Sequence, residues 1–217
     1  MKKHLHLPFL TSFLLVFVCN NLIAQKAVPG KTLNVWLSEG IALKSAPAEK
    51  SKTIVNLPYG TAVKLLKGTE KPTPFSVELS SEAFKTPYKL NGNWVKVEYA
   101  GRQGYAFDGF LSAMPALKTD SHGFAETEDS YLKRNYGVLK IQKRAPKKGT
   151  KETSIYYKNG AITSESGADG CTDHQLYLNN ISLNEAVLFQ KVLYKDLDAA
   201  QNIKIEQVKG GGVKISS

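Results

Sequence analysis

Cysteine and histidine are scarce in this sequence, and their scarcity excludes several classes of protein. The 217 residues include two cysteines and four histidines. A small exported domain stapled by disulfides needs more cysteines, especially since Cys19 lies in a segment that we expect to be removed. Structural zinc sites use paired Cys or His spacings, and no second pair complements Cys171 and His174. We therefore expect a fold held together by hydrophobic burial, with no bound metal and no cofactor.

The sequence also lacks a hydrophobic run long enough for a membrane-spanning helix. Its most apolar segment, Phe9–Val18, falls well short of the ~20 residues that a span requires. A basic start precedes this segment and Ala24-Gln25 follows it, which is the order of a secretory signal peptide. We predict that residues 1–25 are a signal cleaved near Ala24-Gln25 and that the protein is exported, to the periplasm or beyond the cell. The alternative, lipid attachment at Cys19, normally requires a small preceding residue, which is absent here.

Acidic residues are outnumbered by basic ones, and this imbalance bears on the expected partners. The chain has 29 Lys and Arg against 19 Asp and Glu, a formal net charge of +10 at pH 7. Such a protein is suited to a weak association with anionic surfaces. The densest basic stretch, Lys140–Lys151, lacks the interleaved aromatic residues typical of single-stranded nucleic-acid binding. We interpret it as a solvated loop, and nucleic acid is not an expected partner.

The most clearly organised stretch is Trp94–Leu111, which has the pattern of two strands joined by a glycine-containing turn. Val95 and Val97 alternate with Trp94 and with polar residues, the period of two that marks a strand with one buried face. Gly104–Phe107 begins the second strand. If the two valines point inward, Trp94 points outward.

Three motifs occur in an order that resembles the bacterial SH3-like (SH3b) domain. They are Leu43–Pro47, with the pattern hydrophobic-Lys-Ser-x-Pro, Leu57–Val63, with the pattern Leu-Pro-x-Gly-Thr-x-Val, and the hairpin Trp94–Phe107. The resemblance covers about residues 33–114 and implies a small β-barrel that binds a ligand and does not catalyse a reaction. One departure is Lys44, where the family usually has arginine, whose planar fork makes bidentate contacts that lysine cannot make.

The resemblance implies a ligand surface built from aromatic residues of the barrel. The candidate ligand-binding residues are Tyr59, Trp94, Tyr105, Phe107 and Asp108. The implied ligand is a cell-wall peptide, a glycan or an envelope protein. An outward-pointing Trp94 would either line a ligand groove or pack beneath neighbouring chain.

A second departure from the family is the length of residues 68–93, where a short loop is usual. Phe75, Val77 and Leu79 alternate with polar residues, which favours a strand over an unstructured loop. We predict an extra hairpin that packs on the barrel and either covers or extends the ligand groove.

Met114-Pro115 marks the expected boundary between the barrel, residues 26–115, and a second domain, residues 116–217, of no family that we identify. In its first half we expect a helix from Thr127 to Gly137, a strand at Val138–Gln142 and a hairpin at Ser154–Thr163 with a two-residue Asn159-Gly160 turn. A polar loop at Ser164–His174 and a strand at Leu176–Leu178 follow. A Ser182–Glu185 capping box then opens a second helix, whose expected buried face is Leu183, Ala186, Val187, Leu193 and Tyr194, and the last expected strands are Asn202–Val208 and Val213–Ile215. This order predicts an α+β domain, and the whole chain is mainly β plus α+β.

One stretch, Gly170–His174, carries the only serious enzymatic candidate. A nucleophilic cysteine needs a base within hydrogen-bond reach, and His174 lies three residues after Cys171. However, catalytic Cys and His are normally far apart in sequence, and no histidine follows His174. We therefore predict a non-enzymatic binding protein. The alternatives are a cysteine-dependent cell-wall peptidase or transpeptidase that uses Cys171, and a structural envelope component.

Overall fold

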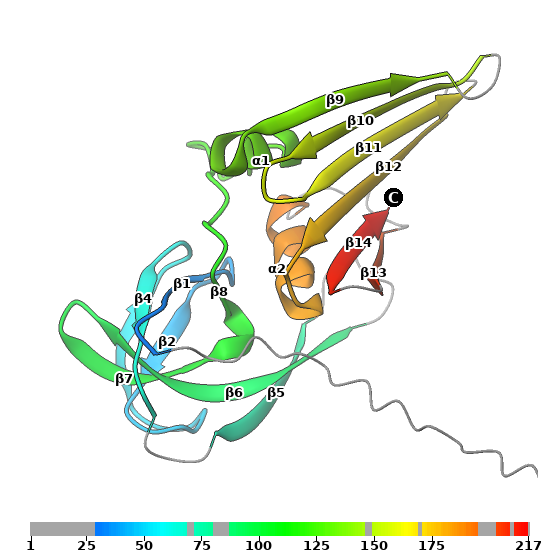
Figure 1. Cartoon of the computed structure of the whole chain (residues 1–217). Coiled ribbons are helices and arrows are strands. Elements are labelled where there is room, and N and C mark those ends of the chain that lie inside the picture. Colours follow the sequence, from blue (N-terminus) through cyan, green and yellow to red (C-terminus); the bar gives the residue numbers. More distant parts are fainter. Residues whose placement is uncertain are drawn as a thin grey trace, which may run out of the picture.

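In the computed structural model, the described residues form two antiparallel sheets and two α-helices (Figure 1). The structure describes residues 29–68, 72–79, 87–145, 149–168, 171–194, 203–208 and 211–216. The predicted signal, residues 1–25 with Cys19, lies outside the described residues. The fold is dominated by strands, which confirms the expected mainly-β class.

The first sheet has eight strands in the order β3-β2-β7-β6-β4-β1-β8, with β5 paired to β6. Its elements are β1 (Thr32–Val35), β2 (Ile41–Lys44), β3 (Thr53–Leu57), β4 (Ala62–Leu65), β5 (Thr73–Leu79), β6 (Tyr88–Tyr99), β7 (Arg102–Phe107), the 3-10 turn η1 (Asp108–Phe110) and β8 (Leu111–Ser112). Every strand except β5 contributes to one apolar cluster, the inner core, made of Val35, Leu43, Leu57, Val63, Leu65, Val97, Ala106 and Leu111. A flat sheet would not bring these side chains together, so the sheet curls around them.

The predicted hairpin of Trp94–Leu111 is confirmed by the pairing of β6 with β7. Its turn is the two-residue Ala100-Gly101, with φ angles of 46° and 74°, which is the backbone that a tight hairpin requires. Gly104 follows on β7 and lies against β2: a Cβ atom there would come within 2.6 Å of the Lys44 carbonyl oxygen. Glycine is therefore required at this position because the two backbones approach so closely.

The insertion also forms a hairpin, as predicted. β5 pairs with β6 from Thr73 opposite Trp94 to Leu79 opposite Tyr88. Residues 69–71 and 80–86 of the insertion lie outside the described residues. Because β6 runs without a break from Tyr88 to Tyr99, the insertion and the strand that carries Trp94 are one continuous element.

The second sheet has six strands in the order β13-β14-β12-β11-β10-β9. They are β9 (Val138–Arg144), β10 (Lys151–Tyr157), β11 (Ile162–Ala168), β12 (Cys171–Asn179), β13 (Lys204–Val208) and β14 (Gly212–Ser216), accompanied by the helices α1 (Glu128–Tyr136) and α2 (Leu183–Leu193). The predicted order of helices and strands is confirmed for the described part of the chain.

Three details of the second sheet correct the sequence analysis. The expected polar loop Ser164–His174 is wrong, because these residues form most of the β11–β12 hairpin. The expected solvated loop at Lys140–Lys151 is wrong at both of its ends, since 140–144 belong to β9 and Lys151 begins β10. The β10–β11 turn is not a two-residue turn. The Gly160 N–H donates to the Tyr157 carbonyl and only Gly160 has a positive φ, which is typical of a longer loop closed by a glycine bulge.

The capping signals of both helices are confirmed. The Thr127 side chain accepts from the Ser130 N–H at the start of α1, and Gly137 ends it with φ 66°. Ser182 and Glu185 form the reciprocal capping box of α2. The buried face of α2 is wider than predicted. Its buried residues are Glu185, Ala186, Val187, Leu188, Phe189, Gln190 and Val192, whereas Leu183 and Leu193 are half-buried. A helix buried on nearly all sides lies between packed layers, and α2 lies between the two sheets (Figure 1).

One large apolar cluster, the shared core, joins the two halves of the chain. From the first half it includes Trp36, Leu90, Trp94 and Phe107, and from the second Tyr131, Leu176, Leu188 and Phe189. Polar contacts reinforce it, since the Ser112 hydroxyl donates to the Glu185 carboxylate over 2.6 Å in a buried position. The expected boundary residue Met114 is itself buried, and its carbonyl accepts hydrogen bonds from Trp36 and Asn34 at 3.0 Å each. The two sheets are thus held together by a common interior.

Candidate ligand-binding surface

Five aromatic residues lie on the face of the first sheet opposite the inner core, and four of them are in ring contact with one another. The register pairs Trp94 with Phe107 and Lys96 with Tyr105, which places these side chains on one face. Phe75 on β5 and Phe110 in η1 complete the set. We call Phe75, Trp94, Tyr105, Phe107 and Phe110 the aromatic strip. Three of the five predicted site residues, Trp94, Tyr105 and Phe107, belong to it.

The centre of the strip is closed to solvent. The Trp94 side chain is 9% exposed and Phe107 is buried as well. The ring of Phe75 lies 5.2 Å from that of Trp94 and 5.1 Å from that of Phe107, measured between centroids. Trp94 therefore points away from the inner core, as its strand parity predicted, and the inserted strand β5 covers it. Phe75, Tyr105 and Phe110 are half-buried and form the open half of the strip.

Asp108 fastens the strip to the neighbouring strand. One of its carboxylate oxygens accepts the Asn93 N–H at 2.7 Å. Gly92 leaves the room for this contact, because a Cβ atom there would lie 2.2 Å from the same oxygen and 2.8 Å from the Phe107 ring. Burial raises the pKa of the Asp108 carboxyl, and the Asn93 hydrogen bonds offset only part of that rise. The position of Asp108 thus gives it a structural role at the edge of the strip.

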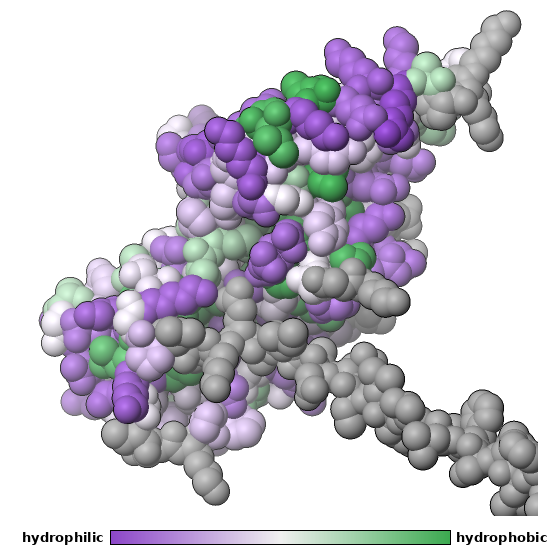
Figure 2. Space-filling view, viewed as in Figure 1, coloured by the Kyte–Doolittle hydropathy of each residue, from purple (hydrophilic) through white to green (hydrophobic). Residues whose placement is uncertain are grey.

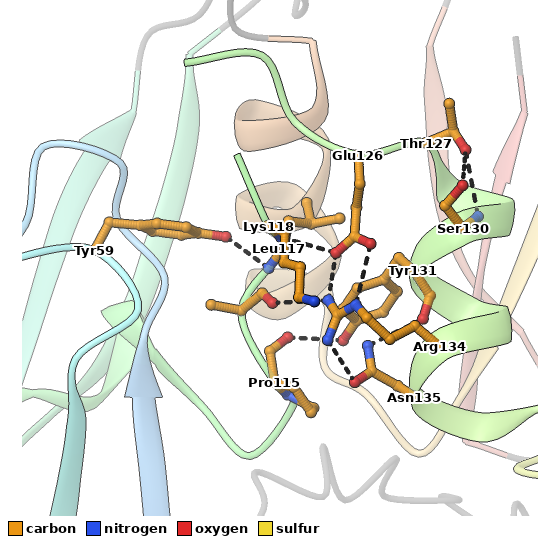
Figure 3. Close-up of polar contacts among 11 residues, drawn as sticks. Tyr59, Pro115, Leu117, Lys118, Glu126, Thr127, Ser130, Tyr131, Arg134 and Asn135 are labelled. Carbon is orange, nitrogen blue, oxygen red and sulfur yellow. Dashed lines mark hydrogen bonds and ion pairs between the residues drawn. The ribbon is translucent and has the colours of Figure 1, made fainter. Parts of the chain in front are cut away.

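Tyr59 lies apart from the strip, beside the connection between the two sheets (Figure 3). Its ring contacts Trp36 edge-on, with centroids 6.2 Å apart. Its hydroxyl oxygen accepts the Leu117 N–H at 2.9 Å. Burial raises the pKa of this phenol to about 12. The sequence analysis placed Tyr59 with the other candidate residues, but the structure uses it to position the connecting segment.

The same connecting segment is held from the other side by α1 (Figure 3). The Arg134 guanidinium forms a two-pronged ion pair with Glu126, and the Lys118 N–H donates to the same carboxylate at 2.8 Å. Burial alone would raise the pKa of Glu126, but the hydrogen bonds from Arg134 and Lys118 lower it below its usual value. The Tyr131 hydroxyl donates to the Pro115 carbonyl at 2.9 Å. These contacts fix the path of the chain between the sheets.

Tyr105 is the member of the strip best placed to meet a ligand. It is half-buried and lies directly opposite Lys44 on β2 and Lys96 on β6. The Lys44 ammonium donates to the Ser51 carbonyl and to the Thr53 hydroxyl, both at 3.2 Å, whereas Lys96 forms no ion pair with the described residues. An aromatic residue paired with a lysine that no described carboxylate neutralises suits a ligand that combines an apolar or sugar face with a carboxylate.

The structure separates the two residues of the enzymatic candidate. Cys171 and His174 both lie on β12, and positions three apart on a strand point to opposite faces. His174 instead faces Glu128 on α1, with 3.3 Å between Nε2 and Oε2. Burial raises the pKa of Glu128, and the charge of His174 opposes that rise. Within the part of the chain that the structure describes, no three His, Cys, Asp or Glu side chains gather closely enough to hold a metal ion.

Sequence reasoning missed an exposed apolar surface on β9. Leu139 is 65% exposed and Ile141 is 56% exposed, although both lie in a strand at the end of the second sheet. The signal was available in the alternation of apolar and basic residues after Val138. What the sequence does not reveal is that β9 is an edge strand, so that its apolar residues receive no cover.

Neither described helix is long and apolar enough to cross a membrane. Comparisons with models of known families, with curated proteins and with solved structures found no match to this chain.

Proposed function

We propose that the chain is an exported, non-enzymatic binding protein in which an SH3-like barrel is joined to an α+β domain. The proposed ligand is a cell-wall peptide or glycan, or an envelope protein, bound at the open half of the aromatic strip. The curled first sheet, with its single inner core built from seven strands, supports the barrel. The three motifs that resemble the SH3b family all lie within this sheet.

The position of Tyr105 carries the proposal. Tyr105 is paired across the sheet with Lys44 and Lys96. It packs against the shared core, whose buried members Trp94 and Phe107 lie on the same face of the sheet. A ring held by packed neighbours loses little conformational entropy on binding, and aromatic residues in such settings often dominate binding energy. Cell-wall peptides carry free carboxylates and glycans present flat apolar ring faces, so both chemistries fit a tyrosine next to Lys96.

The test is co-sedimentation of the chain from residue 26 onward with purified peptidoglycan. We expect Tyr105→Ala and Lys96→Glu each to weaken binding about tenfold, as is usual when a central contact is removed. Tyr177→Ala is the matched control, because Tyr177 is a half-buried tyrosine on β12 of the other sheet. Circular dichroism would verify that all variants keep the fold. Equal binding by wild type, Tyr105→Ala and Lys96→Glu would refute the assignment of this surface.

A further inference from the structure

The outer edge of β9 is a strand-shaped surface that the described part of the chain leaves without a partner. β9 ends the order of the second sheet, and its inner edge pairs with β10 from Arg144 opposite Glu152 to Val138 opposite Tyr157. The register shifts between Tyr156 and Tyr157, so the regular part of the edge is Lys140–Arg144. An edge strand presents a row of backbone N–H and C=O groups that another strand can bind.

A row of side chains shows what the missing neighbour should contribute. Residues directly opposite one another cross the sheet from β14 to β9 in the order Ile215, Leu176, Thr163, Ile155 and Ile141. The first three are buried, Ile155 is half-buried and packs against the shared core, and Ile141 is 56% exposed. The apolar face of the sheet therefore continues to its last strand and ends there uncovered. An added strand with an apolar residue opposite Ile141 would extend the row.

Charge decides which kind of strand fits. β9 carries Lys140, Lys143 and Arg144 and no acidic residue. Lys140 and Arg144 share the face opposite to that of Ile141. Lys140 lies over the Tyr156 ring, 4.3 Å from its centroid, and neither of the two forms an ion pair with the described residues. Figure 2 shows apolar side chains flanked by hydrophilic ones over this end of the second sheet. Pairing with a second copy of β9 would bring like charges together, and lysines on an edge oppose such self-association.

We propose that β9 binds an extended segment of a partner protein by strand addition, and that this segment alternates apolar with acidic residues. Its apolar residues take the face that carries Ile141, with one of them directly opposite Ile141, and its acidic residues take the other face, opposite Lys140 and Arg144. Main-chain hydrogen bonds to the edge provide affinity, and the alternating side chains provide specificity. This surface lies on the sheet that does not carry the aromatic strip, so the proposal is independent of the function proposed above.

The probe is a synthetic peptide of alternating valine and glutamate, labelled for fluorescence anisotropy, with an alternating valine and lysine peptide as its charge-inverted control. We expect the chain from residue 26 onward to bind the acidic peptide saturably and to ignore the basic one. Ile141→Lys and Lys140→Glu should each weaken binding about tenfold or more. Lys64→Glu is the matched control, since Lys64 is an exposed lysine on β4 of the first sheet, and it should leave binding unchanged. Amide hydrogen exchange should slow in β9 when the peptide is bound.

Further variants keep the test decisive. The double variant Lys140→Glu, Arg144→Glu should exchange the preference and bind the basic peptide, a gain that a damaged fold would not produce. Absence of saturable binding by the acidic peptide, or binding that the β9 variants leave unchanged, would overturn the proposal. Sedimentation equilibrium that shows a dimer dissociated by Ile141→Lys would overturn it too, since a second copy would then occupy the edge. Peptidoglycan co-sedimentation of the same variants should remain as in wild type, which separates this proposal from the one for Tyr105.

Discussion

The indole ring of Trp36 stacks on the ring of Phe189, with their centroids 5.8 Å apart and their planes at 28°. Trp36 follows the first strand of the first sheet, and Phe189 lies in the middle of α2, so this single contact ties together residues far apart in the chain. Tyr131 from α1 packs edge-on against both rings. All three rings belong to the shared core.

We expect Trp36→Ala to lower the free energy of unfolding by about 3–5 kcal/mol, as is typical of a buried aromatic residue. Because the core is shared, urea should unfold both sheets in one transition, whether fluorescence or circular dichroism is followed. A double-mutant cycle with Phe189→Ala should reveal coupling of about 0.5–1.5 kcal/mol. A fragment of residues 26–115 lacks Phe189 and should be less stable than the whole chain. Separate transitions for the two sheets would show that the interior is not shared.

Trp94→Ala tests whether the inserted strand stabilises the fold. Since the Trp94 side chain is only 9% exposed and contacts Phe75, its removal should cost about 3–5 kcal/mol in urea unfolding. Phe124→Ala is the control, because Phe124 is 57% exposed and surface changes usually stay within about 0.5 kcal/mol. A loss at Trp94 no larger than at Phe124 would mean that β5 does not cover the indole.

Asp108→Asn should change how stability depends on pH. Burial raises the folded-state pKa of this carboxyl above its ordinary value of 3.8. The stabilising contribution of Asp108 to the free energy of unfolding is therefore fully present below pH 3.8, the pKa of the carboxyl in the unfolded chain, and it is lost as the pH rises through the folded-state pKa. Asparagine keeps an oxygen for the Asn93 N–H and does not ionise. The stability of Asp108→Asn relative to wild type should thus increase over this range, as measured by urea unfolding at successive pH values, and then remain constant. If the stability difference between Asp108→Asn and wild type stays constant or decreases as the pH rises, burial does not raise the pKa of this carboxyl.

Cys171→Ser should leave stability and peptidoglycan binding unchanged. The thiol is exposed, and the strand directs it away from His174. Alkylation at neutral pH should proceed at the rate of a free cysteine and should not respond to His174→Ala. Rapid alkylation that His174→Ala abolishes would restore the cysteine enzyme as the better hypothesis.

Gly104→Ala should destabilise the first sheet by about 1–3 kcal/mol through overpacking. The added methyl group would press on the Lys44 backbone, which cannot move without disturbing the β2–β7 contact. Gly167→Ala is a suitable control, since its Cβ atom would meet nothing closer than 3.4 Å. Equal thermal melting of the two variants would show that β2 and β7 are less closely packed than the structure indicates.

The sequence by itself determined the elements whose signals are local. Thr127 and Gly137 specified the two ends of α1, Ser182 and Glu185 specified the start of α2, and the alternation around Val97 specified which face of β6 is buried. These outcomes depend on capping hydrogen bonds and on the period of a strand, and both are properties of a few consecutive residues.

Tertiary structure alone decided what covers each face. The parity of β6 turned Trp94 away from the inner core, but its burial depends on Phe75 from the insertion. The same kind of alternation left Ile141 exposed, because β9 is the last strand of its sheet. Cys171 and His174 are close in sequence, yet they point to opposite faces because both lie in the extended strand β12. The local sequence did not predict this strand at their positions. The residues that pack over each face are distant in the chain, and a local sequence pattern does not indicate which of them they are.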